Sequence, residues 1–349
     1  MIRRKQSRIF VGVSLTLALT AAACGGGDDT PSAQTNQPAD TQTVPERGGP
    51  DAGRVVFAHS AGVPQIVKLP QSMAVAELAK RGYTVAEEHF QTTTDSIQAV
   101  IRGDALLGNT APANFFSAVA EGADLVAVIG GGRPDYHMMA RSGVNDFCSA
   151  RRVGINNPIS TTDQLVRMEI AKCRNTPAPQ ILSVALTPNR VQALIANELD
   201  AAPAQFSSVP QIERDFPGRI SFLSNMAKDY ADIISTITFV KRDTLERRPR
   251  LVYDFVQSQL QVVRAAYQNA TEMTTFASAS IKSVTAGDMS AAVNEYLKYE
   301  VFPKDGGLSE KEVAATYRSL VDTKMLDASF DPEKFVNRTN LSLALRGLD

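Results

Sequence analysis

The chain has 349 residues, of which 44% are hydrophobic, and its 36 lysines and arginines nearly balance its 37 aspartates and glutamates, giving a formal net charge of −1. Without a basic excess or a long run of lysine and arginine, the sequence lacks the electrostatic signature of nucleic-acid binding. About 300 residues follow the polar N-terminal region, which is enough for two lobes that each bury a core of their own.

The N-terminus has the pattern of an export signal rather than of a folded element. Basic residues between positions 3 and 8 precede an apolar stretch at 9–19, which is too short to span a bilayer comfortably. Small residues at 21–23 then stand directly before Cys24. This order predicts a signal peptide over residues 1–23.

Cys24 and the small residues before it resemble the lipobox of bacterial lipoproteins, in which the cysteine is lipidated and becomes the new N-terminus. The lipobox usually has leucine three positions before the cysteine, where this chain has Ala21, so ordinary signal-peptidase cleavage is the alternative. Residues 24–53 contain almost nothing apolar and cannot bury enough surface to offset their ordering entropy. We expect a disordered tether that is lipid-anchored on the extracytoplasmic side, periplasmic or cell-surface, of a bacterial cell membrane.

Strands and helices alternate after the tether. The expected strands are 54–58, 83–90, 105–108 and 124–129, and the expected helices are 65–80, 96–102 and 114–120. A second set follows, with strands at 152–155, 181–186, 201–205 and 220–223 and helices at 164–172 and from Thr187. Such alternation is typical of an α/β protein with mostly parallel sheets.

Two segments, 137–141 and 236–242, are interpreted as crossings between lobes, and two hinge strands of this kind allow clamshell closure around a ligand. Helices are expected at 244–269, 286–299 and 309–324, with a last segment from 330, packed against the first lobe. The predicted organisation is therefore lobe one at 54–140, lobe two at 141–235, and a return to lobe one with C-terminal helices at 236–349.

The chain also carries a weak internal repeat. Residues 97–101 and 105–108 form a helix end, a short polar turn and a small-residue strand, and residues 191–195 and 199–202 do the same. The repeat suggests two similar lobes with a ligand between them at the strand ends. Chance similarity between α/β units is the alternative.

The cysteines and histidines of the body are few. In an exported chain, an isolated pair such as Cys148 and Cys173 is predicted to form a disulfide. The histidines, at 59, 89 and 137, do not have the spacing of a zinc site, so no metal site is predicted.

From residue 54 to the C-terminus the chain resembles the solute-binding proteins of bacterial ABC importers, of the nitrate, sulfonate, taurine and thiamine-precursor type. Residues 99–108 and 120–128 are similar to the motifs AL-x-x-G-x-x-D-x-G and A-x-x-G-x-D-L-V-x-V, with Leu107 in place of the usual aspartate. Residues 157–161 are similar to N-x-P-G-S-T. Residues 190–202 are similar to R-x-x-A-L-x-x-G-x-x-D-A, with Asn197 in place of glycine, and asparagine tolerates the left-handed turn.

The resemblance implies a two-lobed type II periplasmic-binding fold with hinge strands between the lobes and C-terminal helices on lobe one. It also implies an extracytoplasmic monomer that delivers a small solute to an ABC permease and its ATPase, without catalysis or a cofactor. The solute class stays open between sulfonate, taurine or nitrate, a thiamine precursor and an aromatic carboxylate. The alternatives are a sensory or structural lipoprotein on the same fold, and a thiamine-pyrimidine-synthase-like enzyme, whose cysteine-rich iron motif Cys148 and Cys173 do not form.

Ligand contacts are expected where helices begin, because free N–H groups and the helix dipole favour anions there. Plain N-capping uses the same residue types and is the alternative. Arginine can hold a carboxylate or sulfonate bidentately, and tyrosine can stack on a flat ligand. The candidate ligand-binding residues are His59, Thr92, Thr93, Asn109, Thr110, Tyr136, Ser160, Thr161, Thr162, Arg190 and Gln205.

Overall fold

The structure, a computed structural model, describes residues 43–45, 54–174, 176–327 and 330–348. The predicted signal peptide, Cys24 and all of the predicted tether except residues 43–45 lie outside the described residues. Residues 42–349 form one compact unit. Within the part that is described, no helix combines the length and the apolar character needed to cross a membrane.

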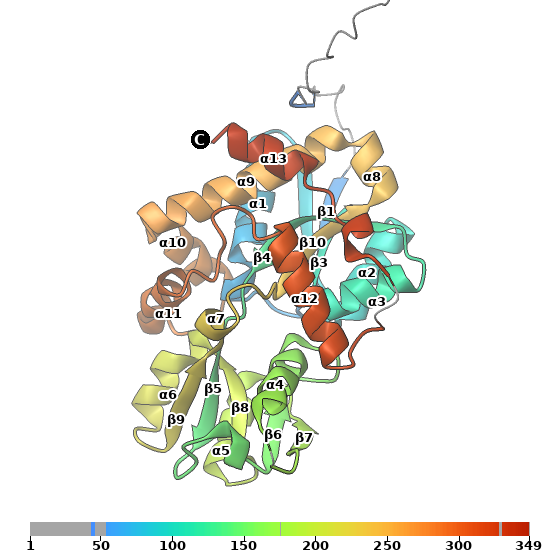
Figure 1. Cartoon of the computed structure of the whole chain (residues 1–349). Coiled ribbons are helices and arrows are strands. Elements are labelled where there is room, and N and C mark those ends of the chain that lie inside the picture. The colour runs from blue at the N-terminus through green and yellow to red at the C-terminus, as the bar shows by residue number, and fades with distance from the viewer. Residues whose placement is uncertain (1–42, 46–53, 175, 328–329, 349) are drawn as a thin grey trace, which may run out of the picture. The chain divides into compact units, whose positions relative to one another are not determined.

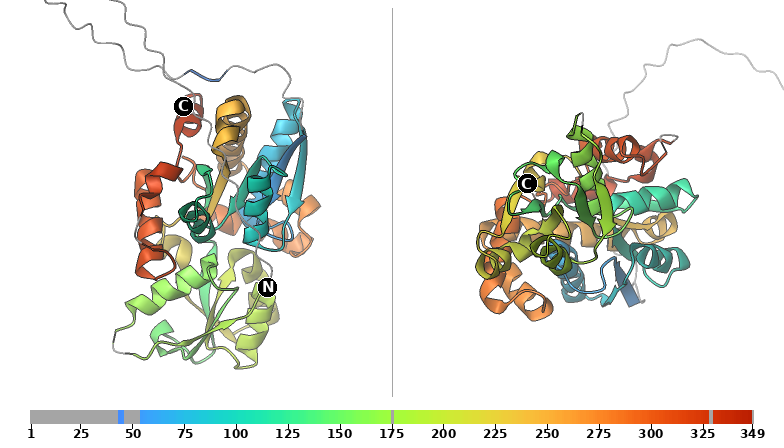
Figure 2. Two further views of the ribbon diagram at one scale, coloured as in Figure 1. Left: turned by 90° about the vertical axis from the view of Figure 1, so that its right-hand side faces the viewer. Right: turned by 90° about the horizontal axis from the view of Figure 1, so that it is seen from below.

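Two five-stranded sheets organise the chain, and they lie in separate lobes (Figures 1 and 2). The first sheet has the order β2-β1-β3-β10-β4. Its strands are β1 (Arg54–His59), β2 (Thr84–His89), β3 (Leu107–Thr110), β4 (Leu125–Gly132) and β10 (Thr236–Lys241). Strand β1 pairs in parallel with β2 and β3, whereas β10 runs antiparallel between β3 and β4.

Helices cover both faces of the first sheet. They are η1 (Ile66–Lys68), α1 (Leu69–Lys80), α2 (Thr93–Arg102) and α3 (Pro112–Ala120), joined from the C-terminal region by α9 (Pro249–Gln268) and α13 (Thr339–Arg346). Buried aromatic side chains meet across these layers: Phe57 stacks on Phe255 of α9, and Phe115 of α3 contacts Phe239 of β10. Burial of this cluster stabilises the first lobe.

The second sheet has the order β7-β6-β8-β5-β9. Its strands are β5 (Tyr136–Arg141), β6 (Arg152–Ile155), β7 (Gln180–Ser183), β8 (Ala201–Gln205) and β9 (Ile220–Asn225), and β9 lies at the edge, as expected for residues 220–223. Its helices are η2 (Phe147–Ser149), α4 (Thr161–Lys172), α5 (Thr187–Ile195), η3 (Phe206–Ser208), α6 (Val209–Asp215) and α7 (Met226–Asp229).

The two sheets share one topology, which explains the sequence repeat. In each, a helix leads into the third strand of the parallel set: α2 into β3 and α5 into β8. The turns also match, because Gly103 after α2 has φ +83° and Asn197 after α5 has φ +57°. Asparagine thus supplies the left-handed conformation that glycine supplies in the first copy.

The prediction that the chain crosses between the lobes at residues 137–141 is wrong. In the described part of the chain, strand β5 pairs with β8 on one side and β9 on the other, so these residues lie inside the second sheet. The chain therefore crosses between Gly132 and Tyr136, and the predicted lobe boundary at residue 140 falls within lobe two. The return is placed as expected, because β10 begins at Thr236 in the first sheet.

The C-terminal region is more divided than expected. Pro249 interrupts the predicted helix 244–269, because proline lacks an N–H, and it separates α8 (Arg242–Arg247) from α9. Helix α10 (Thr271–Ser280) is additional, and α11 (Ala286–Lys298), α12 (Glu310–Asp322) and η4 (Pro332–Phe335) follow.

These helices also reach lobe two. On α11, Asp288 pairs with Arg214 of α6, with one carboxylate oxygen 2.8 Å from the guanidinium, and the ring of Tyr296 contacts Phe206. Helix α12 extends toward α4 (Figure 1), where the Gln164 amide donates a 2.7 Å hydrogen bond to the Ser319 hydroxyl. The C-terminal helices therefore pack on lobe one and touch lobe two on both sides of the crossing segments.

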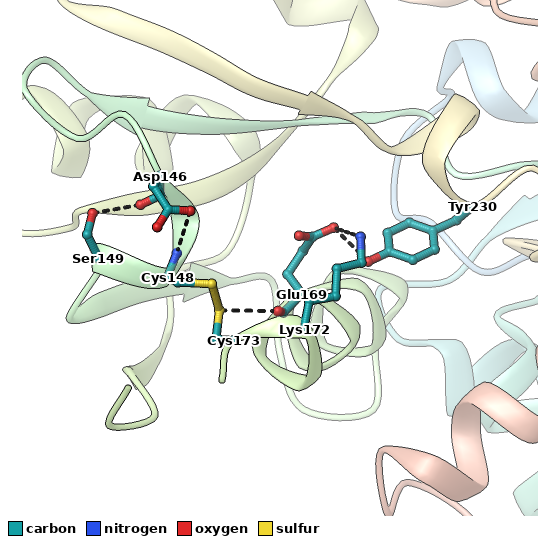
Figure 3. Close-up of a disulfide and its surroundings, with 7 residues drawn as sticks. All are labelled: Asp146, Cys148, Ser149, Glu169, Lys172, Cys173 and Tyr230. Carbon is teal, nitrogen blue, oxygen red and sulfur yellow. Dashed lines mark hydrogen bonds and ion pairs between the residues drawn. A yellow bond between two sulfur atoms is a disulfide. The ribbon is translucent and has the colours of Figure 1, made fainter. Parts of the chain in front are cut away.

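Cys148 and Cys173 form a disulfide in lobe two (Figure 3). It joins η2 to the residue that follows α4. Beside it, Glu169 accepts hydrogen bonds from the Tyr230 hydroxyl and from Lys172, whose ammonium also lies over the Tyr230 ring. The bridge and this network fix the C-terminal end of α4.

Candidate functional site

Polar side chains from both lobes gather where the chain crosses between them. Strands β1 and β3 end at the same edge of the first sheet as β4, from which the chain leaves for lobe two, and β10 begins there. We call the following group the inter-lobe cluster: Lys68, Gln71 and Thr236 from lobe one, and Asp135, Tyr136, Arg190 and Gln205 from lobe two or the crossing.

Lys68 brings a buried positive charge to the cluster. Its side chain is 8% exposed and its ammonium donates to the Thr236 hydroxyl at 3.2 Å. Burial lowers the pKa of Lys68 to about 8, although the negative charge of nearby Asp135 opposes that shift. Among the described residues no carboxylate lies within ion-pair distance of this ammonium.

Gln71, in the first turn of α1, is fully buried, yet neither of its amide atoms has a hydrogen-bond partner in the described part of the chain. An unpaired buried amide costs free energy, so such a group is uncommon without a purpose. The amide nitrogen lies against Gly131 of β4, where a Cβ atom would stand 2.2 Å away. Gly131 therefore makes room for Gln71 beside Thr236.

Replacing Gly131 with alanine should displace the Gln71 amide, because the added Cβ would also lie 2.9 Å from the Thr236 methyl carbon. We expect a loss of about 1–3 kcal/mol in the free energy of unfolding, measured by urea denaturation. Gly287, a glycine of α11 with no neighbour within 4 Å of an added Cβ, is the matched control, and there alanine should stabilise slightly. Equal effects of the two variants would show that Gly131 is not sterically required.

Asp135, in the crossing segment, connects elements of both lobes through its carboxylate. It is 2% exposed and accepts from the Tyr296 hydroxyl at 2.7 Å and from the Gln205 amide at 3.1 Å. Burial raises the pKa of Asp135, while these hydrogen bonds and the charge of Lys68 oppose the rise. The carboxyl group thus links α11, β8 and η1 at the place where the lobes meet.

Arg190 carries the second buried cation of the cluster. It is 2% exposed, and its guanidinium donates to the carbonyl oxygens of Pro203 and Val184 and to the Thr187 hydroxyl. All these partners are neutral, and within the described ranges no carboxylate reaches ion-pair distance. Burial lowers the pKa of Arg190, and its phenolic neighbour Tyr136 opposes that.

Tyr136 and Gln205 face each other across the paired strands β5 and β8, at the edge nearest lobe one. Burial raises the pKa of the Tyr136 phenol, and the charge of Asp135 adds to the rise. The structure therefore places the sequence-based candidates Tyr136, Arg190 and Gln205 close together around Asp135.

The hydroxyl groups at the start of α4 serve the helix itself. Ser160 is the N-cap, accepting from the Asp163 amide, and the Thr162 hydroxyl accepts from the Asn156 amide. Thr161 instead faces the returning crossing segment, because its hydroxyl donates to the Ser235 carbonyl at 3.4 Å. Helix capping therefore accounts for Ser160 and a local contact with Asn156 for Thr162, while Thr161 lies against a segment that joins the lobes.

The candidate residues in the first lobe have structural contacts of their own. Thr92 is exposed and caps α2 through the Asp95 amide, and Thr93 is the first residue of that helix. His59 and Asn109 are fully buried and hydrogen-bonded to each other. Thr110 is also buried, and its hydroxyl has no partner among the described side chains and backbone groups.

The arrangement around His59 does not match a catalytic triad. Ser72 and Glu87 both approach the Nε2 atom of His59, at 3.5 and 2.6 Å. A nucleophile and an orienting carboxylate must occupy different ring nitrogens for proton transfer to work. In the described ranges no group of three or more His, Cys, Asp or Glu side chains is placed to hold a metal ion.

Sequence reasoning missed several members of the inter-lobe cluster. Lys68 and Gln71 lie on the polar side of an otherwise apolar helix start, and Asp135 follows a glycine-rich strand end at the crossing. An acidic residue directly before the expected hinge segment 137–141 is the signal that would have pointed to Asp135, whereas no local signal marks Lys68 and Gln71. Two surface cavities, one lined by Tyr317 and Asp331 and the other by Leu245 and Asn340, lie away from the cluster and include none of its residues.

Comparison with known proteins identifies the fold. No family model matches the sequence, and no curated protein matches it. Among solved structures, the chain is similar to the putative periplasmic sulfonate-binding protein SsuA of an ABC transporter from Methylobacillus flagellatus KT. The two share 13% identity with a TM-score of 0.65, and the match covers 85% of this chain and 94% of that one. It is also similar to the periplasmic nitrate-binding protein NrtA from Synechocystis PCC 6803, with 12% identity, a TM-score of 0.64 and coverage of 85% and 89%.

The same fold also occurs in DszB, seen as a mutant in complex with biphenyl-2-sulfinic acid, with 10% identity, a TM-score of 0.58 and coverage of 84% and 99%. At these identities the likeness establishes the fold alone. The expected two-lobed periplasmic-binding fold is confirmed, and a fold by itself does not specify a ligand or an activity.

Proposed function

We propose that this chain is the extracytoplasmic solute-binding component of an ABC importer. It captures a small polar or anionic organic solute between its lobes and presents it to the permease and ATPase. The observation that carries the proposal is the pair of buried cations, Lys68 and Arg190, one from each lobe, with neutral hydrogen-bond partners only among the described residues. Among the described residues neither cation forms an ion pair, and Lys68 has only the charge of nearby Asp135 to offset its burial. An anionic group between the lobes would reduce the cost of burying both charges.

The fold supplies the route to this site. The cluster is largely buried between the lobes, so a solute reaches it when the lobes move apart about the two crossing segments. Closing then surrounds the solute with groups from both lobes at once. Lys68 and Arg190 favour an anionic group, whereas the Asp135 carboxyl and the Tyr136 hydroxyl accept or donate hydrogen bonds to its polar remainder.

Cys24 is the proposed lipid anchor, which would hold the protein at the membrane near its permease. We propose that the protein acts there as a monomer. Mass spectrometry of the N-terminal peptide tests this: a diacylglyceryl-modified Cys24 supports it, and an unmodified, cleaved N-terminus contradicts it. A sensory or structural lipoprotein is the competing role. Reconstitution with the cognate permease and ATPase separates the roles, because only a transport component stimulates uptake of the bound solute.

Thermal unfolding of residues 42–349 against a solute panel is the direct test of the function. The panel contains sulfonates, taurine, nitrate, thiamine precursors, riboflavin and aromatic carboxylates. A solute present at a hundred times its dissociation constant stabilises a protein by about 2.7 kcal/mol, which shifts the midpoint by several degrees. A shift with one class identifies the solute, and no shift with any class contradicts capture of these solutes.

Binding of an anionic solute should weaken as the pH rises past about 8, because Lys68 loses its positive charge there. The dissociation constant, measured by calorimetry, should increase by up to about tenfold per pH unit above that value. Lys68→Arg should flatten the profile, since arginine keeps its charge. Lys80→Met, at the exposed far end of α1, is the control and should leave the profile unchanged. A flat wild-type profile between pH 7 and 10 would remove Lys68 from the site.

A further inference from the structure

A buried histidine in lobe one lies at the centre of a directed hydrogen-bond chain. His59, the last residue of β1, is fully buried, and its Nε2 atom lies 2.6 Å from a carboxylate oxygen of Glu87 on β2. Its Nδ1 atom lies 3.1 Å from the Nδ2 atom of Asn109 on β3. The oxygen of the same Asn109 amide accepts from the backbone N–H and the hydroxyl of Ser60, each at 3.0 Å.

The directions of these hydrogen bonds fix the tautomer of His59. A backbone N–H can only donate, so Ser60 requires the Asn109 oxygen on its side. The Asn109 nitrogen then faces His59 and donates to Nδ1, which must carry a lone pair. The proton of a neutral imidazole therefore sits on Nε2 and is donated to the Glu87 carboxylate.

A positively charged His59 is incompatible with this order. Protonation would place an N–H at Nδ1 against the donating nitrogen of Asn109. Rotating the Asn109 amide would satisfy His59 but would turn the same nitrogen toward the Ser60 N–H. One of the two contacts must therefore be lost when His59 is charged.

The other groups around His59 also bear on its charge. Burial lowers the pKa of His59, a shift that the hydrogen bond and charge of Glu87 oppose and that the charges of His89 and Lys68 reinforce. Burial would raise the pKa of Glu87, but hydrogen bonding and the charge of His59, together with the Ser72 hydroxyl, hold it below its usual range. The geometry and these surroundings both favour a neutral His59 that is hydrogen-bonded to an ionised Glu87.

Ser60 begins the loop that leads from β1 to η1 and thus to Lys68 and Gln71. The next residue, Ala61, is held as well, because its carbonyl oxygen lies 3.2 Å from Nδ1 of His89, whose ring stacks on His59 at 4.6 Å. The loop at this edge of lobe one is therefore attached to the buried network at consecutive residues.

We propose that Glu87, His59 and Asn109 form a positioning relay that holds Ser60 and its loop at the inter-lobe edge, and that protonation of His59 releases this loop. Only the expected effect of the relay on solute binding rests on the proposed function. Glu87 acts through His59 and Asn109, and none of the three needs to touch the solute. An acidic solution thus loosens the lobe-one wall of the site, and a neutral one tightens it.

Nuclear magnetic resonance of the imidazole nitrogens tests the relay without a solute. In the wild type, His59 should be protonated at Nε2 and unprotonated at Nδ1 at neutral pH, and it should titrate below its ordinary pKa. Hydrogen-exchange protection of the Ser60 amide should disappear as the pH falls through that titration. A proton on Nδ1 at neutral pH, or protection of Ser60 that ignores the titration, would overturn the proposal.

Asn109→Asp is the decisive variant, because a carboxylate can accept from both Ser60 and a protonated Nδ1. The His59 pKa should move from below to above its ordinary value, and Ser60 should stay protected at acidic pH. Glu87→Gln should lower the His59 pKa further, whereas Glu88→Gln, at the adjacent, exposed position that faces Arg54, should leave it unchanged. An unchanged titration in Asn109→Asp contradicts the relay even if the wild-type tautomer is as expected.

The solute panel at pH 5 and pH 7.5 separates this proposal from the proposed function. If a solute binds, its affinity should fall at pH 5 in the wild type and hold in Asn109→Asp. If no solute of the panel binds at either pH while the tautomer and exchange results are as expected, the relay stands and the proposed function fails.

Discussion

Removing the disulfide between Cys148 and Cys173 should lower the free energy of unfolding by about 3.5 kcal/mol. The two cysteines are 25 positions apart in the sequence, and a closed loop of that length restricts the unfolded chain to this extent in the chain-entropy account. The bridge joins η2 to the residue that follows α4. In the chain-entropy account its effect comes mainly from restricting the unfolded state rather than from packing in the folded state.

Urea denaturation of residues 42–349 measures this effect in oxidised wild type, in reduced wild type and in the Cys148→Ala, Cys173→Ala double variant. Reduced wild type and double variant should agree with each other, because both lack the loop closure. The double variant should be insensitive to reductant, which is the internal control. A difference below about 1 kcal/mol between oxidised and reduced wild type, or two titratable thiols in the folded protein, would mean that the bridge does not close in solution.

The disulfide and the internal repeat show what short-range reasoning can predict. The repeat is visible in the sequence because each copy packs a helix end, a turn and a small-residue strand into about a dozen consecutive residues. The turn is a local property, so Asn197 could be expected in the left-handed conformation, and its φ of +57° agrees. The two copies also occupy equivalent positions in the two sheets, because β3 and β8 both lie at the centre of a five-stranded sheet.

The crossing could not be placed in the same way. Residues 137–141 look like a strand in any context, and only their partners decide to which sheet they belong. Strand β5 finds β8 and β9, which lie more than sixty positions further on, so a long-range pairing settles a boundary that composition leaves open. The division of helix 244–269 is a different case, because its cause is local. Pro249 lies in the first turn of α9, and a proline inside a helical pattern can mark the start of a new helix.

The candidate site could be predicted only in part, because polar residues at helix starts have two physical uses. Ser160 and Thr92 cap their helices, as the alternative interpretation allowed, and sequence alone cannot separate capping from ligand contact. His59 illustrates a second limit. Its position near the end of a strand could be expected from the sequence, but its hydrogen-bond partners Glu87 and Asn109 could not, because only the folded sheet brings them to its two ring nitrogens.

Replacing Arg190 should have the largest effect on solute binding of any single substitution in the cluster. Its guanidinium is 2% exposed and has only neutral partners in the described residues, so an anionic solute would supply the missing counter-charge. Breaking a buried pair of charges costs about 3–5 kcal/mol, which corresponds to a dissociation constant raised by roughly two to four orders of magnitude. We expect this loss in Arg190→Gln once the panel has identified the solute.

Arg190 also supports lobe two, so binding and stability must be measured separately. Its side chain links α5 to the Pro203 carbonyl of β8 and to the Val184 carbonyl after β7, and losing these hydrogen bonds should cost about 1–3 kcal/mol of unfolding free energy. Arg190→Lys keeps the charge but not the planar fork. It should therefore be destabilised to a similar degree while retaining more of the affinity than Arg190→Gln.

Arg219 provides the matched control for this comparison. It lies in the same lobe and also donates to a backbone carbonyl, that of Ile195, but its side chain is exposed. Arg219→Gln should change neither the affinity nor the stability by more than about 0.5 kcal/mol. If Arg190→Gln is destabilised yet binds the solute with the wild-type dissociation constant, the guanidinium is a structural clamp for α5, and the anionic group must be held by lobe one, where Lys68 is the remaining buried cation of the cluster.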